Sequence, residues 1–168
     1  MTSIGLISDT HGWLDPKVFE HFKNCNEIWH AGDFGTISLA ETLVAETGLP
    51  IRGVYGNIDG QDVRNKFPEQ IVFMCEGVKV MMRHIGGYPP KYNPETKKEI
   101  IIQQPNLFIG GHSHILKIMN DDKWHCLHMN PGAAGKQGWH KIRTIIRFVI
   151  DETAIKDCEV IELGTRSE

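Results

Sequence analysis

Residues 107–114 read Leu-Phe-Ile-Gly-Gly-His-Ser-His, and this stretch decides the architecture that we predict for the chain. Its apolar start indicates the end of a buried strand, and the double glycine lets the backbone pass close to a neighbouring centre. If the chain stays extended, His112 and His114 project to the same side of it. Two imidazoles on one side suggest metal ligation, although the pair alone also fits a glycine turn with two solvated histidines.

Four earlier apolar runs end in the same way, around residues 4–7, 28–29, 51–55 and 78–82, with metal-ligating residue types directly after them. Each polar residue alone could be a turn aspartate, a helix N-cap or a satisfied buried histidine. Sites in open α/β sheets form at the carboxyl ends of strands, so we expect the polar residues to converge. The five strand ends offer seven donors: Asp9, His11, Asp33, Asn57, His84, His112 and His114.

The number and type of these donors predict a centre of two divalent ions. Seven donors are too many for one zinc ion, which usually takes four, whereas two ions sharing a carboxylate would use them all. Imidazole, carboxylate and amide ligands suit manganese, iron or zinc better than copper(I) or calcium. Two ions about 3.5–4 Å apart clamp a phosphoryl group and lower the pKa of bound water. The ligands therefore predict metal-assisted hydrolysis, with a small phosphoester as the substrate.

Composition indicates one domain, residues 1–168, of a soluble globular type, with 40% hydrophobic and 23% charged residues. A net charge of -3 gives no basic field for general nucleic-acid binding. The apolar runs are too short to cross a bilayer, and the first residues do not resemble a signal peptide. The four cysteines form no C-x-x-C pair, so we expect reduced thiols and a cytoplasmic location. The oligomeric state stays open, and a homo-oligomer is compatible with the sequence.

The front half of the chain alternates predicted strands and helices, whereas the back half is rich in strands. Helices are expected after the N-cap Asp15, from a capping box at Ser38 and Glu41 to Gly48, and from Asn93 until a proline stops it. Strands are expected at 126–129, 142–151 and roughly 154–163. This order predicts a mixed α/β domain of two packed sheets with helices outside them.

The donor motifs, taken as a set, resemble those of the calcineurin-like metallophosphoesterases over about residues 4–135. The matching elements are D-x-H at 9–11, G-D at 32–33, G-N at 56–57, the strand-end His84 and G-H-S-H at 111–114. The N-P-G element at 130–132 is similar to one in the small single-domain bacterial and archaeal branch.

This resemblance implies a four-layer α/β/β/α sandwich of two mixed sheets flanked by helices. It also implies a bridging hydroxide as nucleophile and two divalent ions, with manganese first and iron, zinc, cobalt or nickel as alternatives. One ion would be held by Asp9, His11, Asp33 and His114. The second would be held by Asp33, Asn57, His84 and His112, so that Asp33 bridges the two.

The sequence departs from the family at Ile58, where many members carry a histidine that assists the leaving group. A general acid is worth about 10²–10⁴ in rate, so we expect slow turnover of poor leaving groups. The missing histidine and the resemblance to the small branch together imply a preference for phosphodiesters over monoesters. The neighbouring Asp59 could substitute as the acid if its pKa were raised. The predicted catalytic residues are therefore Asp33, Asn57 and Asp59. The alternative is a non-catalytic scaffold, as in the retromer subunit of this fold.

Several residues near the motifs keep two interpretations. The loop at 85–92, with Tyr88, Lys91 and Tyr92, either shapes the substrate pocket or is a plain surface loop. His30 either orients a ligand or is a buried structural histidine. The tryptophans at 13 and 139 could line the mouth of the site, but core packing is the favoured interpretation for both.

Overall fold

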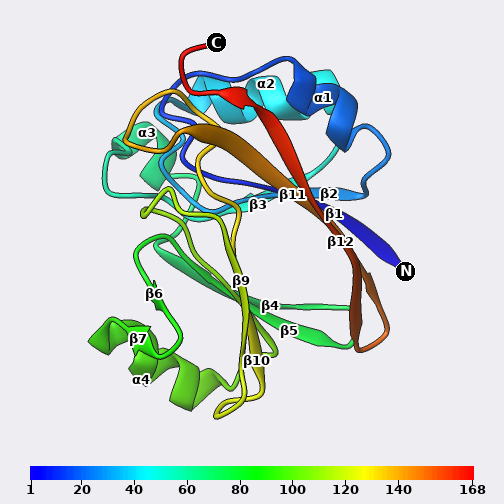
Figure 1. Cartoon of the computed structure of the whole chain (residues 1–168), viewed down its shortest axis with the longest axis vertical. Coiled ribbons are helices and arrows are strands. Elements are labelled where there is room, and N and C mark those ends of the chain that lie inside the picture. Colours follow the sequence, from blue (N-terminus) through cyan, green and yellow to red (C-terminus); the bar gives the residue numbers. More distant parts are fainter.

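The computed structural model describes residues 1–168 and contains two five-stranded mixed sheets (Figure 1). The first sheet has the order β12-β11-β1-β2-β3, in which β1, β2 and β3 are parallel and β11 and β12 are antiparallel to their neighbours. Its strands are β1 (Thr2–Ile7), β2 (Glu27–His30), β3 (Ile51–Gly53), β11 (Ile142–Asp151) and β12 (Ala154–Thr165).

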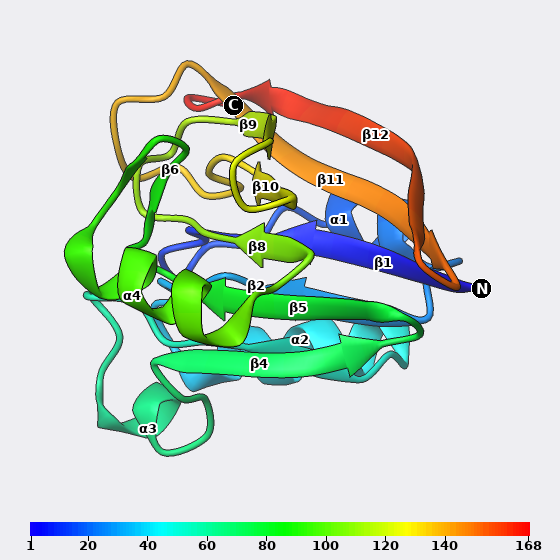
Figure 2. The same ribbon diagram turned by 90° about the horizontal axis from the view of Figure 1, so that it is seen from below.

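The second sheet has the order β4-β5-β8-β10-β9, with β5, β8 and β10 parallel and the outer strands antiparallel (Figure 2). Its strands are β4 (Gln70–Cys75), β5 (Val78–Arg83), β8 (Leu107–Ile109), β9 (Lys117–Asp121) and β10 (Cys126–Asn130). The sequence analysis missed β4 and β9. Both are edge strands, and the exposed positions in each weaken the apolar pattern that reveals a buried strand.

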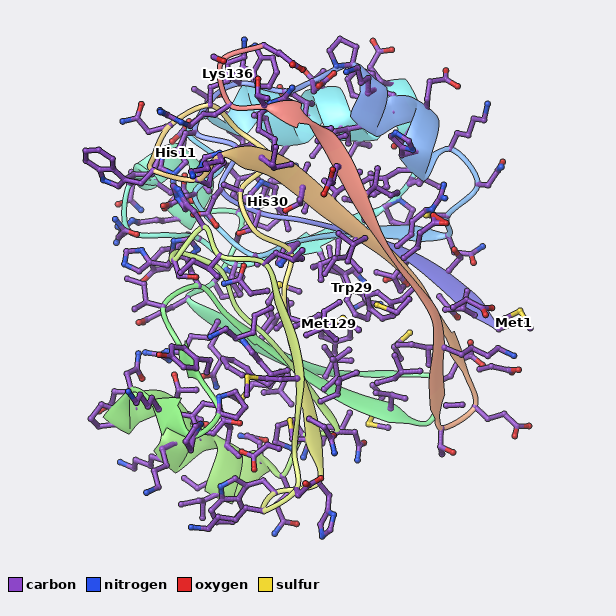
Figure 3. All side chains as sticks on the ribbon, viewed as in Figure 1. Met1, His11, Trp29, His30, Met129 and Lys136 are labelled. Atoms are coloured by element: carbon purple, nitrogen blue, oxygen red, sulfur yellow. The ribbon has the colours of Figure 1, made fainter.

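Helices cover the two outer faces. Figure 1 shows α1 (Lys17–Phe22) and α2 (Ile37–Thr47) over the first sheet and α4 (Pro94–Gln103) on the far side of the second. Three separate apolar clusters fill the three interfaces between these layers. The central cluster contains Trp29 and Met129, which lie between the sheets in Figure 3. The predicted four-layer α/β/β/α sandwich is confirmed.

The helix boundaries test the predicted capping signals. Asn93 caps α4 as expected, because its side chain accepts the backbone N–H of Thr96 at 2.9 Å. Gly48 ends α2 in the left-handed conformation, also as expected. The capping box at Ser38 is wrong: α2 begins at Ile37, so Ser38 already lies inside its first turn.

The short helix α3 (Gln61–Arg64) and the ribbon of β6 (Gly87–Tyr88) and β7 (Lys91–Tyr92) complete the chain. The loop predicted at residues 85–92 is therefore a small hairpin. None of the helices has both the length and the apolar character that spanning a membrane requires.

Candidate metal centre

All seven predicted donors lie at one end of the sandwich. The parallel strands of each sheet bring their carboxyl ends to this end, so the loops after β1, β2, β3, β5 and β8 meet there. In Figure 3, His11 lies at this end of the molecule, away from Trp29 in the central core. The predicted convergence of the donors is what the structure shows.

The donors form two clusters. Asp9, His11 and His114 make one, and Asp33, His84 and His112 make the other; within each cluster the ligand atoms lie within 4.8 Å of one another. The carboxylate of Asp33 faces both, since its Oδ2 lies 3.5 Å from His11 Nε2 and 3.1 Å from His84 Nε2. Asn57 joins the second cluster, with its Oδ1 3.0 Å from His112 Nδ1.

The backbone conformation of the donor residues differs from the extended one that the sequence analysis considered. An extended chain would place His112 and His114 on one side, but they have φ angles of 72° and 61°. They belong to different clusters, which is the grouping that the family resemblance implied. Asp9, His11 and Asp33 are also left-handed, with φ between 46° and 58°. Such conformations are uncommon for residues other than glycine and concentrate at functional sites. Loop geometry, rather than strand alternation, therefore aims the ligands.

The buried polar atoms of this site fit divalent metal ions. Asp9 Oδ1, His11 Nε2 and His84 Nε2 are buried and have no hydrogen-bond partner. Nearly all buried polar groups in proteins are paired, so three such atoms facing one space make it a candidate ligand site. Two are imidazole nitrogens and one is a carboxylate oxygen, which is a donor set for manganese, iron or zinc.

Hydrogen bonds to the outer atoms hold the ligands in orientation. His84 Nδ1 donates to the carbonyl of Ala31 at 2.7 Å, which turns its Nε2 toward Asp33. Asp9 Oδ2 accepts the Ser8 hydroxyl at 2.7 Å and the His112 backbone N–H at 3.1 Å, which leaves its Oδ1 free. Asp33 Oδ1 accepts the Ile58 N–H at 3.0 Å, and a Cβ at Gly56 would lie only 2.0 Å from that same oxygen.

The charges in the site stabilise one another. Burial raises the pKa of Asp9, but the neighbouring imidazoles of His11 and His114 outweigh it, so that the net shift is downward. The pKa of Asp33 is also lowered, because the neighbouring imidazole of His84 outweighs burial. In return, the pKa of His84 is raised: burial lowers it, but the two carboxylates outweigh that effect. Both carboxylates are therefore ionised near neutral pH.

Asp59, the predicted substitute acid, has a different position. It is buried, and its two oxygens accept the backbone N–H groups of Phe34 at 3.2 Å, Gly35 at 2.9 Å and Gly56 at 2.8 Å. A carboxylate occupied by three amide donors holds the loops after β2 and β3 together. This placement corrects the assignment of Asp59 as proton donor, because both of its oxygens are already engaged within the protein.

His30 is a buried structural histidine. Its Nδ1 accepts the Gly32 N–H at 3.1 Å, its Nε2 lies 3.0 Å from the Thr10 hydroxyl, and its ring stacks on Phe34. Burial lowers its pKa to about 3, so the ring is neutral. It joins the two loops that carry Asp9 and Asp33 without contacting either carboxylate through its own hydrogen bonds.

The sequence analysis missed His140 and misjudged Trp139. His140 Nε2 donates to the Gly135 carbonyl at 2.8 Å, its buried Nδ1 has no partner, and its ring packs edge-on against His114 at 5.1 Å. Trp139 is 98% exposed, so core packing is wrong for it, and it lines a pocket beside His112 and His114. The glycine-rich stretch at 132–138 was the sequence signal that could have revealed these residues, because glycines let the backbone pass close to a site.

Two further pockets adjoin the second cluster. One of about 360 Å³ is lined by Asn57, His84, Arg64 and Arg83, among others. Another of about 290 Å³ is lined by His112, Tyr88, Lys91 and Lys117, among others. The residues at 85–92 therefore shape a pocket beside the centre, which is one of the two interpretations of this loop.

Comparison with known proteins places this fold and site in a family. The model of the calcineurin-like phosphoesterase superfamily domain matches residues 2–153. The chain therefore belongs to the calcineurin-like phosphoesterase superfamily, as the resemblance of its motifs indicated. No curated protein sequence matches the chain.

Solved structures share the whole fold at low sequence identity. An archaeal phosphodiesterase has a TM-score of 0.73 and 23% identity, with 96% of this chain and 99% of that chain covered. A predicted phosphoesterase from Streptococcus pneumoniae has a TM-score of 0.70 and 21% identity, with 99% and 90% covered. Vps29 from Entamoeba histolytica, solved with Zn²⁺, has a TM-score of 0.73 and 14% identity, with 95% and 98% covered. At these identities the likeness concerns the fold.

Proposed function

We propose that this chain, as one domain of residues 1–168, is a metal-dependent phosphoesterase that hydrolyses small phosphodiesters in preference to monoesters. The observation that carries the proposal is the trio of buried, unpaired atoms on Asp9, His11 and His84 around the carboxylate of Asp33. No structural role of the fold requires three such atoms to face one another.

The residues would hold two divalent ions, with manganese as the first candidate. Asp9, His11 and His114 would hold one, while His84, His112 and Asn57 would hold the other, and Asp33 would contact both. Such ions supply electrostatic stabilisation of the phosphoryl oxygens and a nucleophilic water of lowered pKa. Sharing a single carboxylate requires that Asp33 remain ionised and fixed, which its bond from the Ile58 N–H achieves.

The chain offers no evident proton donor for the leaving group. The Ile58 side chain, 46% exposed at the position where many relatives have histidine, cannot donate a proton. Both oxygens of Asp59 are occupied by backbone amides. We therefore infer that the enzyme acts best on esters whose leaving group needs no protonation. The absence of a donor, together with the resemblance to the small branch of the family, supports the preference for diesters.

The surroundings of the cysteines support a cytoplasmic location. The structure contains four free cysteines, of which Cys25, Cys75 and Cys126 are buried. Burial raises the pKa of each of these three thiols, which keeps them protonated and unreactive. A protein with only free thiols is suited to a reducing compartment.

An activity assay on chelator-stripped protein tests this proposal. Manganese is added back, and bis(p-nitrophenyl) phosphate is compared with p-nitrophenyl phosphate. Manganese-dependent turnover favouring the diester is the expected result. A preference for the monoester would support the enzymatic function but refute the proposed preference for diesters.

The second candidate is a non-catalytic scaffold, supported by the fold shared with Vps29 and by the exposed Ile58 and Trp139 at the centre's rim. Absence of turnover with manganese, zinc, iron, cobalt and nickel, in protein that binds these metals, would favour the scaffold over the enzyme.

A further inference from the structure

The pocket of about 290 Å³ beside His112, called here the lysine pocket, has a composition that the proposed reaction alone does not explain. Its walls come from the hairpin β6–β7, from the loop after β8 and from the start of β9. The lining residues that carry its chemistry are Tyr88, Lys91, His112, Ile115, Lys117 and His128. Because His112 belongs to the second donor cluster, a molecule in this pocket lies directly beside the candidate metal centre.

The lysine pocket is cationic. Lys91 and Lys117 line it, and none of its lining residues is acidic. At its base lies His128, which is buried and bonded through Nδ1 to the Phe108 carbonyl at 3.1 Å. Burial lowers the pKa of His128 to about 4, so the ring is neutral. The positive charge of the pocket therefore comes from the two lysines, and no carboxylate within the pocket offsets it.

The neighbouring pocket of about 360 Å³ combines positive and negative side chains. Its two arginines, Arg64 and Arg83, are accompanied by Glu69 and Glu95. Arg83 is paired with Glu69 at 3.0 Å, and Arg64 donates to the backbone carbonyl of Asp59 at 2.7 Å. This pocket offers no net charge, whereas the lysine pocket does, and the two meet at Ile85 and Asn93 beside the same donor cluster.

The lysine pocket also presents planar and apolar surface. Lys117 Nζ lies 3.4 Å from the ring centre of Tyr88, so the cation is held over an aromatic face. Ile85 and Ile115 are 42% and 60% exposed at its edges. Tyr92 is fixed by a hydrogen bond from its hydroxyl to Asp121 at 2.7 Å. A ligand that fits these walls carries an apolar or aromatic portion next to its anionic group.

We propose that the lysine pocket binds one ester substituent of the substrate, and that this substituent carries a further anionic group, phosphate or carboxylate, beside an aromatic or apolar portion. The inference rests on the proposed phosphodiesterase function and specifies its substrate class: a diester with one anionic and one uncharged substituent. The uncharged substituent occupies the arginine-lined pocket, where each cation already has a partner.

Steady-state kinetics with manganese-loaded protein test this inference. Three aryl phosphodiesters are compared: bis(p-nitrophenyl) phosphate, an analogue with a carboxylate on one ring, and an analogue with a phosphate there. A charged contact is worth about 1.5 kcal/mol or more, so we expect KM to be about tenfold lower for at least one anionic analogue. Which of the two analogues gains identifies the anion. Equal KM values for all three diesters would overturn the proposal.

The variant for this experiment is the double substitution Lys91→Met and Lys117→Met, which keeps the unbranched apolar stems and removes both charges. The matched control is Lys123→Met, because Lys123 also lies over an aromatic ring, that of Trp124 at 5.2 Å, but lines a separate pocket. The double variant should lose the roughly tenfold advantage in KM of the anionic analogue over the uncharged diester. The control should behave as the unmodified protein.

A binding measurement separates this proposal from the reaction itself. Calorimetric titration with non-hydrolysable phosphonate analogues of the same three diesters requires no turnover. Tighter binding of an anionic phosphonate that disappears in the double variant would support the lysine pocket even in a protein that shows no hydrolysis. Equal dissociation constants for the unmodified protein and the double variant would refute it, whatever the activity.

Discussion

Two buried polar clusters in this molecule are satisfied to different degrees. One is the candidate metal centre, where three buried atoms of Asp9, His11 and His84 have no partner. The other is the Arg143 cluster, in which Arg143, only 1% exposed, donates to Asp15 at 2.8 Å and to the Thr165 carbonyl at 3.0 Å. The guanidinium also lies 4.8 Å from the ring centre of Trp13.

The difference between the two clusters separates a binding site from a structural support. A buried charge costs several kcal/mol unless it is paired and hydrogen-bonded, and Arg143 satisfies this condition entirely within the chain. The metal centre does not, and its ligands also adopt left-handed backbone conformations. Unfavourable backbone geometry and unpaired atoms in one place are typical of a binding site rather than of a structural support.

The largest effect is expected from Asp33→Ala, which removes the carboxylate that faces both donor clusters. Changes to outer partners of metal ligands already cost about 10–100-fold in affinity or activity, so loss of this ligand should reduce kcat/KM by more than about 100-fold. Asp33→Asn is the matched control for folding, because it keeps an acceptor for the Ile58 N–H. Metal content and kcat/KM are measured together, and full turnover of metal-saturated Asp33→Ala would refute the bridging role.

Arg143→Met should act on stability alone. It leaves Asp15 buried without its cation, and breaking a buried ion pair costs about 3–5 kcal/mol of the free energy of unfolding. The control on the same strand is Arg147→Met, since the partner of Arg147 is the exposed Glu159 and such pairs contribute about 0–1 kcal/mol. Denaturant unfolding measures both. Equal losses of unfolding free energy in the two variants would show that the buried pair contributes no more to stability than the exposed pair.

Gly138→Ala should weaken metal binding although it changes none of the donor residues. A Cβ at Gly138 would lie 2.2 Å from His114 Nδ1, and the φ of 129° disfavours any side chain. We expect metal affinity at the Asp9, His11 and His114 cluster to fall about 10–100-fold, as for other changes in the support of a ligand. Gly48→Ala, where φ is 71° and no atom lies within 4 Å, controls for backbone strain. Unchanged metal titrations would contradict the expectation.

Acid should destabilise the Arg143 cluster. Burial raises the pKa of Asp15, but the Lys17 N–H and Arg143 outweigh it, so the pKa in the folded state is lowered. Its contribution to stability is therefore complete above the unfolded value of about 3.9 and is lost as pH falls below it. Thermal unfolding of metal-free protein between pH 6 and 2 should show a shallower acid loss for Asp15→Asn. Identical pH profiles would exclude Asp15 as a source of the acid sensitivity.

The smallest effect is expected from Ile58→His, which adds a proton donor at the rim of the metal centre. Turnover of diesters with poor leaving groups should rise, but by less than the about 100-fold that an established general acid provides, because nothing orients the new ring. Esters with good leaving groups serve as the control and should not change. Equal rates on both classes would mean that position 58 does not face the substrate.

Much of this architecture could be predicted from the chain alone. The alternating pattern of β11, the Asn93 cap of α4 and the end of α2 at Gly48 are local signals, and the structure confirms them. Edge strand β4 was missed because its half-exposed residues carry little pattern. No local signal indicated that the charged side chain of Arg143 is buried, because its partners Asp15 and Thr165 come from segments far away in the chain.

The sequence by itself determined the seven donors, their order along the chain and the family to which they belong, because each donor follows an apolar run that must become a strand. Tertiary structure decided the backbone geometry that presents those donors. His112 and His114 both have left-handed φ angles and lie in different clusters, and the His112 backbone N–H is bonded to the Asp9 carboxylate at the end of the first sheet. Tertiary structure also decided that Asp59 binds backbone amides and that Lys91 and Lys117 share a pocket. In both cases the residues that come together belong to segments far apart in the chain.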